Sequence, residues 1–278
     1  MEIKRTKYTI KGNELSILES GDKNNPIALF VHGIPANAKL WTRTMEQLSD
    51  NGYYALAFDI PGFGETKVTE DFDYSLKGAA SLINNWLIEQ NFENIWLIAH
   101  DIGGGIAQIM LTLNESLYQK VTLSNSITAD TWPVPAIEGI IGAAKSGMFT
   151  SLAETGAIAT QLGPVIKDTF VNKKSITDYI LNDVFLDSKF NSKEGRDKFI
   201  KLLKALDPKH TIENMKKLSK VTIPLHLIWA MQDPNQPWDG PGKILKETFK
   251  TVRVSQIENA GHFLQLDAPK EYFNLLIS

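Results

Sequence analysis

The sequence contains no cysteine, and this absence excludes three kinds of chemistry. A disulfide framework, a thiolate metal site and a cysteine nucleophile all require that side chain. An excess of positive charge is also missing, since 29 basic and 32 acidic residues give a formal net charge of −3. Proteins that bind nucleic acid usually carry a basic surface, so we expect no nucleic-acid partner. We interpret one basic stretch, residues 188–220, as a solvated helical face.

Long uncharged apolar runs are absent too. A membrane-spanning helix needs about 18 consecutive apolar residues, and no run in the sequence approaches that length. The first residues, MEIKRTKYTIKG, are charged and lack the apolar stretch that a signal peptide places behind such charges. We therefore expect a cytoplasmic protein that does not act on membranes.

What is present is the composition of an ordinary globular protein. Hydrophobic residues make up 43% and charged residues 22% of 278 residues. One large α/β core accommodates a chain of this length. We expect a monomer or a homodimer.

Short apolar segments rich in β-forming residues alternate with helical patterns along the first part of the chain. Such segments are typical of strands that are buried on both faces of a parallel sheet. Two alternating segments within residues 1–20 predict an antiparallel edge. Four predicted strands are of this buried kind: Pro26–His32, Tyr53–Asp59, Asn94–His100 and Lys120–Ser126. Two more strands are predicted later in the chain, at Ile223–Trp229 and Val252–Glu258.

The strand signals stop after residue 130 and return at Ile223. Between them, Pro133 to about Leu218 has the pattern of several helices broken by proline, glycine and asparagine. A strand-rich chain interrupted once by helices indicates an insertion rather than a second domain in series. We therefore predict a core formed by residues 1–130 and 219–278, with a helical cap at residues 131–218.

The segment Ala99-His100-Asp101-Ile102-Gly103-Gly104 lies where a predicted strand ends and a helix begins. This is the pattern of a nucleophile elbow, a strained turn that exposes its central side chain. The positions two before and two after the central residue must be small, and Ala99 and Gly103 satisfy that requirement. The central residue is Asp101 rather than serine.

Three further loops follow predicted strands. His32-Gly33-Ile34-Pro35 comes after the first buried strand, Asp233 follows Leu225–Trp229, and His262 follows the last strand. The order nucleophile, acid, histidine along a chain is that of the α/β-hydrolases and not of the other triad folds.

Nearly the whole chain thus resembles the α/β-hydrolase superfamily. The aspartate at the elbow makes it similar to the branch of epoxide hydrolases and haloalkane or haloacid dehalogenases, whereas serine esterases need a hydroxyl at position 101. The resemblance implies a mostly parallel eight-stranded sheet, flanked by helices and carrying an inserted helical cap.

The resemblance also implies a cofactor-independent hydrolase without a metal site. Asp101 attacks an sp³ carbon and forms an ester, which water then cleaves. His262 takes a proton from that water, and Asp233 orients the imidazole. The backbone N–H groups of Ile34 and Ile102 form the oxyanion hole.

The position of the acid has alternatives. In part of this branch the acid follows the strand that precedes the cap, where this sequence has Asn125 and Asp130. Asn125 carries no charge, and Asp130 lies several residues beyond the apolar run. Asp233 is the acid that we predict, with Asp130 as the alternative.

The sequence leaves two leaving groups open, a halide and the oxygen of an epoxide. Haloalkane dehalogenases commonly have asparagine and tryptophan where this chain has Ile34 and Ile102, which weakens that assignment. Epoxide opening needs a proton donor, and Tyr179 is the only tyrosine of the predicted cap. A helix over Ser175–Asp187 places Tyr179 on an apolar face, and His210 is a second possible donor.

We include Trp132, Tyr179, His32 and His100 among the residues expected around the substrate. Packing roles are the alternatives for all four, and for the two histidines they are the simpler interpretation. The sequence therefore predicts an epoxide hydrolase acting on a small apolar epoxide with water. The alternatives are a haloalkane or haloacid dehalogenase and a catalytically idle homologue that only binds a ligand.

Overall fold

The computed structural model describes residues 2–155, 157–186 and 192–278. Its centre is one sheet of eight strands in the order β1-β2-β4-β3-β5-β6-β7-β8. Only β2 pairs antiparallel with its neighbours, β1 and β4, while the other adjacent pairs are parallel. The predicted mostly parallel sheet with an antiparallel edge is confirmed. The strands are β1 (Lys4–Ile10), β2 (Asn13–Ser20), β3 (Ile27–Val31), β4 (Tyr54–Phe58), β5 (Ile95–His100), β6 (Tyr118–Ser124), β7 (Leu225–Ala230) and β8 (Val252–Ile257).

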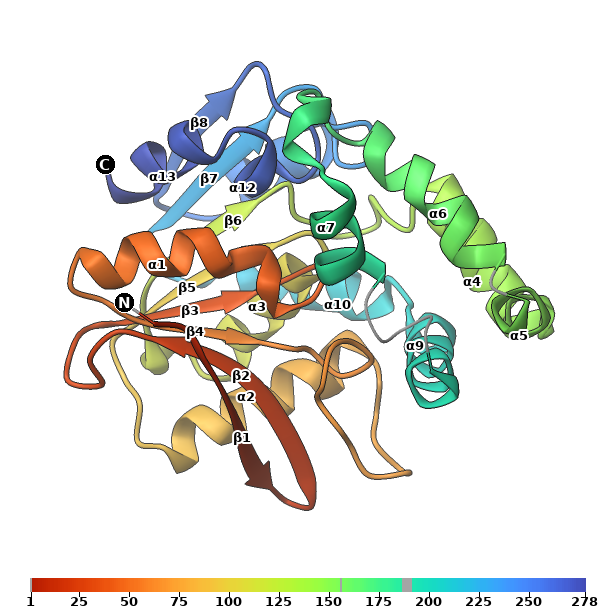
Figure 1. The fold of residues 1–278 in the computed structure, drawn as a ribbon. Helices are drawn as coiled ribbons and strands as arrows, with labels where there is room; N and C mark the ends of the chain where they lie inside the picture. Colours follow the sequence, from red (N-terminus) through yellow and green to blue (C-terminus); the bar gives the residue numbers. More distant parts are fainter. Residues whose placement is uncertain (1, 156, 187–191) are drawn as a thin grey trace.

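Helices cover both faces of the sheet (Figure 1). On one face α1 packs against α13, and on the other α3 packs against α2 and α10. The strands β3, β4 and β5 are buried at every position, which is why their sequences are continuous apolar runs. The helices and turns outside the β6–β7 connection are η1 (Ala38–Trp41), α1 (Thr42–Asp50), α2 (Leu76–Glu89), α3 (Ile102–Leu113), η2 (Glu115–Leu117), η5 (Trp238–Gly242), α11 (Lys243–Thr248), α12 (Leu264–Asp267) and α13 (Pro269–Ile277).

The connection from β6 to β7 is helical. Figure 1 shows most of these helices gathered on one side of the sheet, with α4, α5 and α6 extending away from it. They are α4 (Pro135–Ser146), α5 (Met148–Glu154), α6 (Ala157–Asp168), η3 (Lys173–Ser175), α7 (Asp178–Ile180), the π-helix η4 (Leu181–Leu186), α9 (Lys193–Ala205) and α10 (Lys209–Leu218). Among the described residues, no helix is long and apolar enough to cross a bilayer.

The single helix predicted over Ser175–Asp187 is wrong for the residues that the structure describes. Residues 173–186 instead form a 3₁₀ turn, a short α-helical turn and a π-helix. Because each of these has its own number of residues per turn, a spacing of 3.6 does not describe which side chains share a face.

Candidate active site

Asp101 occupies the sharp turn between β5 and α3. Its backbone angles are φ 53° and ψ −125°, a strained conformation for a residue with a side chain. The turn is possible because its neighbours are small. A Cβ atom on Gly103 would lie 2.2 Å from the carbonyl oxygen of His32, and one on Gly33 would lie 2.4 Å from the Cβ of Asp101. Both glycines are therefore needed for the close approach of the β3 loop to Asp101.

The carboxylate of Asp101 is buried and accepts hydrogen bonds from the backbone. The N–H of Ile34 donates to Asp101 Oδ1 at 2.9 Å, and the N–H of Ile102 is a second backbone partner. Burial raises the pKa of Asp101, while His262 and the two backbone N–H groups oppose that rise. The structure thus brings the backbone N–H groups of Ile34 and Ile102 to the carboxylate of Asp101.

His262 lies between the two aspartates. Its Nε2 is 3.7 Å from Asp101 Oδ2, and its Nδ1 is 2.8 Å from Asp233 Oδ2. Burial disfavours the imidazolium form, but the Asp233 carboxylate more than compensates, with help from Asp101, so the pKa of His262 is raised. Burial likewise disfavours the Asp233 carboxylate, yet contact with His262 lowers the pKa of Asp233 on balance. The pair orients the ring with Nε2 towards Asp101.

The two alternative acids have very different surroundings. Asp130 is exposed to solvent. Asn125 is fully buried after β6, and its Nδ2 donates to Asp233 Oδ2 at 2.7 Å. Its Oδ1 accepts the N–H of Ala230 at 2.9 Å, which ties the Asp233 loop to the end of β6. Asn125 therefore supports Asp233. The sequence signal for this partnership was a polar residue directly after a buried strand.

The structure packs His100 and His32 into the core next to the site, and neither lines the cavity described below. His100 is fully buried, and its Nδ1 lies 2.9 Å from the carbonyl oxygen of Ser124. Its ring lies against that of His262, with centroids 4.6 Å apart. His32 accepts the N–H of Ile60 at its Nε2 and is also fully buried. Their contact with a substrate stays a prediction, and the contacts that they make here are those of the packing interpretation.

A cavity of about 120 Å³ opens beside Asp101 and His262. Apolar side chains supply most of its lining, and many come from the helices between β6 and β7. Among them are Ile137, Ile140, Phe149, Leu162, Ile166 and Phe199. The polar residues of the lining are Asp101, His262, Thr169, Asn235 and Gln236. The sequence reasoning missed Asn235 and Gln236, although both follow Asp233 within the same loop.

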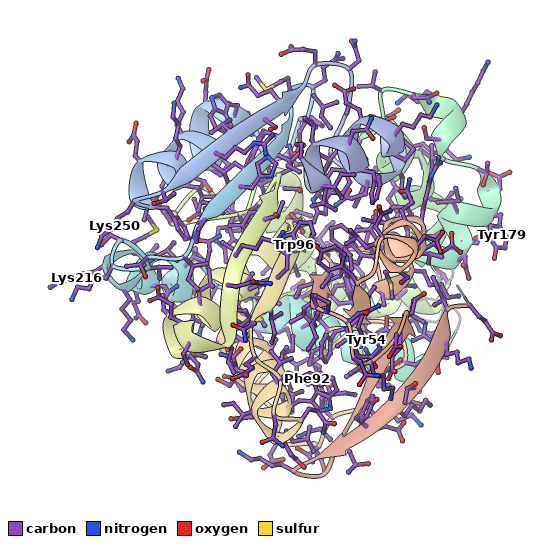
Figure 2. The ribbon with its side chains drawn as sticks, turned by 90° about the vertical axis from the view of Figure 1, so that its left-hand side faces the viewer. Tyr54, Phe92, Trp96, Tyr179, Lys216 and Lys250 are labelled. Atoms are coloured by element: carbon purple, nitrogen blue, oxygen red, sulfur yellow. The ribbon has the colours of Figure 1, made fainter. Side chains whose placement is uncertain are left out.

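Trp132 and Tyr179 do not line this cavity. Trp132 is buried, and its indole Nε1 donates to Thr211 Oγ1 at 2.8 Å, which joins the start of the helical segment to α10. Tyr179 is 76% exposed and lies at the periphery of the molecule in Figure 2. It borders a separate open groove next to α1. The prediction that Tyr179 faces apolar surroundings is therefore wrong, because the irregular turns at residues 173–186 rotate it outwards.

His210, the second predicted donor, borders a shallow depression between α3 and α10 and is not part of the cavity lining. Among residues 2–155, 157–186 and 192–278, no group of three or more histidine and acidic side chains is arranged to hold a metal ion.

Comparisons with known proteins agree with this architecture. A family model described as "alpha/beta hydrolase fold" matches residues 26–162. Epoxide hydrolase 3 of Xenopus tropicalis is 25% identical over an alignment that covers 94% of this chain and 72% of the relative. A haloalkane dehalogenase of Psychrobacter cryohalolentis is 26% identical, with coverage of 94% and 85%. The crystal structure of an alpha/beta hydrolase fold protein from Burkholderia ambifaria superposes with a TM-score of 0.84 at 20% identity, covering 98% of this chain and 96% of that one.

Proposed function

Since this chain belongs to the α/β-hydrolase superfamily, we propose that it is a hydrolase whose nucleophile is the carboxylate of Asp101. One observation carries the proposal. Asp101 Oδ1 is held by the N–H of Ile34 at 2.9 Å, and Oδ2 lies 3.7 Å from His262 Nε2. This leaves Oδ2 as the oxygen available for attack, with the base already beside it.

In the first step, Asp101 Oδ2 forms a bond to an sp³ carbon of the substrate. The bond from that carbon to its leaving atom breaks, and the leaving atom departs with the electron pair. The product is an ester of Asp101, which carries no charge. The strained turn holds the carboxylate at the floor of the cavity, where few other orientations are open to it.

In the second step, water attacks the Cγ of the Asp101 ester. His262 Nε2 accepts a proton from the water, and Asp233 stabilises the resulting imidazolium. The negative charge that develops on the carbonyl oxygen of the ester, Asp101 Oδ1, is stabilised by the N–H groups of Ile34 and Ile102. Collapse of the intermediate releases the alcohol, which takes its proton from His262, and leaves Asp101 as a carboxylic acid. That acid gives its remaining proton, the second one from the water, to His262 and from there to solvent, which restores the carboxylate of Asp101.

The cavity supports a small apolar substrate. Its volume is about 120 Å³, and an apolar cavity of roughly 150 Å³ is known to accommodate benzene. Helices α4, α5, α6 and α9 supply much of the apolar lining, so residues 131–218 act as the cap of a core formed by residues 1–130 and 219–278. Among the described residues of the lining, no side chain apart from His262 can carry a positive charge, which argues against carboxylate substrates such as haloacids.

Haloalkane dehalogenation is the reaction that the lining supports best. Among the described residues that line the cavity none is a tyrosine, and only Asp101 and His262 ionise near neutral pH. An alkoxide leaving from an epoxide needs a proton donor, whereas a halide leaves as a stable anion. Epoxide hydrolysis is the second candidate, favoured by the similarity to epoxide hydrolase 3. A catalytically idle fold is disfavoured because His262 lies close enough to Asp101 to activate water there.

The test is direct detection of the ester. The variant His262→Gln, incubated with a panel of bromoalkanes and small epoxides, is expected to gain the mass of the alkyl or hydroxyalkyl group, and peptide mapping should place it on Asp101. The double variant Asp101→Asn, His262→Gln is the matched control and should gain no mass. A panel that leaves His262→Gln unmodified, or a modification retained in the control, contradicts the proposal.

A further inference from the structure

Gln236 is a buried polar residue in the lining of the apolar cavity. It is 3% exposed and shares the cavity with Asp101 and His262. Its side-chain Oε1 is shielded from solvent and has no hydrogen-bond partner among the described residues. A buried carboxamide without a partner is unfavourable in the free protein, so a native structure that keeps one calls for a specific reason.

The position of Gln236 is fixed by its backbone. Its carbonyl oxygen accepts the indole N–H of Trp229 at 2.8 Å, and Trp229 is fully buried at the end of β7. The same loop carries Asp233, whose Oδ1 accepts the N–H of Asn235 at 2.7 Å. The carboxamide is therefore presented from a rigid loop that also positions the predicted acid, an arrangement suited to a preformed binding group.

The other polar side chains of the described lining are either engaged or reached by solvent. Thr169 Oγ1 donates to the carbonyl oxygen of Ile166 at 2.7 Å. Asp101 and His262 have the roles proposed above, and Asn235 is only half-buried, so water can reach it. Gln236 is thus the enclosed polar group of the lining that the proposed chemistry does not yet use.

We propose that the carboxamide of Gln236 binds the leaving halide while the ester of Asp101 forms. The inference rests on the proposed function and adds a specificity residue to it. The halogen is the polar atom of a haloalkane, and the apolar lining matches the rest of the molecule. A carboxamide carries two N–H donors and one acceptor, and rotation about its last bond exchanges their positions.

The chemistry of the first step requires such a donor. As the bond from Asp101 Oδ2 to carbon forms and the bond from carbon to halogen breaks, the negative charge moves from the carboxylate to the halogen. A hydrogen bond from Gln236 Nε2 strengthens as that charge develops, so it stabilises the transition state more than the bound substrate. No proton is transferred, and the halide departs as the anion. The carboxamide thereby supplies a hydrogen bond to the halide. The side chains of Ile34 and Ile102 cannot supply one, because they carry no donor.

The experiment measures ester formation alone, in the His262→Gln background where the ester persists. Rates of mass gain are compared for matched chloro-, bromo- and iodoalkanes, with and without Gln236→Met, which keeps the length of the side chain and removes its donor. We expect ester formation to slow by roughly 10²-fold for the chloroalkane. We expect a smaller loss for the iodoalkane, because iodide is the weaker hydrogen-bond acceptor.

Two further variants separate a leaving-group role from a packing role. Gln236→Glu retains the shape and replaces the donor with a carboxylate, so it should slow the reaction at least as strongly and serves if Gln236→Met does not fold. Gln232→Met removes an exposed carboxamide from the same loop, where Gln232 donates to the carbonyl oxygen of Glu258, and should leave the rates unchanged.

The outcomes distinguish this inference from the proposed function. If His262→Gln forms no ester with any haloalkane or epoxide, the proposed function fails. If it forms the ester, but Gln236→Met reacts at an unchanged rate or is slowed equally with all three halides, only the role of Gln236 is overturned. Ester formation with epoxides alone also overturns it. A loss graded from chloride to iodide supports it.

Discussion

The backbone N–H of Ile34 donates a 2.9 Å hydrogen bond to Asp101 Oδ1, which makes the two oxygens of this buried carboxylate unequal. In the mechanism proposed above, the oxyanion of the second step develops on Oδ1. Oδ2 has no such restraint from Ile34 and faces His262. In that mechanism, the same contact orients the nucleophile in the first step and stabilises charge in the second.

Asp101→Asn is expected to abolish turnover and to stabilise the fold. Activity should fall by roughly 10⁴-fold or more, because the ester cannot form. Burial raises the pKa of Asp101, so the ionised carboxylate is less favourable in the folded than in the unfolded chain above its ordinary pKa. Neutral asparagine removes that cost and tolerates a positive φ. Thermal unfolding at neutral pH should therefore show a higher midpoint.

The matched control for this prediction is Asp130→Asn. Asp130 is exposed, so both activity and thermal midpoint should remain near those of the unmodified protein. A lower midpoint for Asp101→Asn, or a strong loss of activity in Asp130→Asn, would contradict the assignment.

The pH midpoint of ester breakdown should differ from the pKa of His262 in the free protein. His262 must be neutral at Nε2 to accept a proton, and its pKa is raised, so ester breakdown should slow as the pH falls through that pKa. Esterification neutralises Asp101, which is one of the charges that raise the pKa of His262. The midpoint for ester breakdown should therefore lie below the pKa of His262 in the free protein.

Rapid-mixing measurements of ester breakdown at a series of pH values, compared with an NMR titration of His262 in the free protein, check this difference. The ester should also accumulate at acidic pH. Equal midpoints would mean that Asp101 does not influence His262, in conflict with their 3.7 Å separation.

Asp233→Asn should slow ester breakdown by roughly 10²- to 10⁴-fold, since the imidazolium loses the carboxylate beside Nδ1. Adding Asn125→Asp should recover part of that loss. Asn125 Nδ2 lies 2.7 Å from Asp233 Oδ2, so the exchange moves the negative charge only by the length of that hydrogen bond. Single-turnover rates measure both effects. A double variant slower than Asp233→Asn alone would argue that Asn125 acts only through the geometry of the loop.

Gly33→Ala should lower kcat by about 10²-fold, because displacement of a reacting group by about 1 Å has that effect. The added Cβ would lie 2.4 Å from the Cβ of Asp101 and 2.5 Å from its Oδ1. Gly142→Ala is the control, since a Cβ at this exposed position of α4 meets nothing within 4 Å. It should leave activity unchanged and stabilise the helix by roughly 0.5–1 kcal/mol, as measured by denaturant unfolding. Similar activity of the two variants would contradict the steric role of Gly33.

Tyr179→Phe should change activity by no more than about twofold, as expected for an exposed position remote from the cavity. Initial rates with an epoxide and a bromoalkane are the measurement. A selective loss with the epoxide would restore Tyr179 as a proton donor, and would require residues 173–186 to adopt another arrangement when substrate binds.

The sheet and the central residues of the site could be predicted from the sequence because the signals are local. Buried strands of a parallel sheet are continuous apolar runs, and the ends of such strands meet at one edge. Polar residues just beyond β5, β7 and β8 therefore lie close to one another, and this brings Asp101, Asp233 and His262 together. The elbow added a requirement for small neighbours that Ala99 and Gly103 meet.

Three features could not be predicted from the sequence: the direction of Tyr179, the contact between Asn125 and Asp233, and the burial of Gln236. Tyr179 was placed by a period of 3.6 residues, but its segment changes helix type twice within residues 173–186, and a periodic pattern carries no information about such changes. The contact between Asn125 and Asp233 joins residues 108 positions apart, and no local pattern reports it. Gln236 could not be singled out, because glutamine is common after turns and the sequence does not show that its carboxamide is buried.

All eight strands, and each of Asp101, Asp233 and His262, lie outside the stretch of chain that runs from α4 to α10. Much of the apolar surface that a substrate would meet lies inside that stretch. The three residues proposed to react and many of the apolar residues that line the cavity are therefore encoded in separate parts of the sequence. Exchange of one contiguous segment between related chains would change the molecules accepted while the reacting centre stayed as it is, a route to new specificity that this arrangement leaves open to evolution and to engineering.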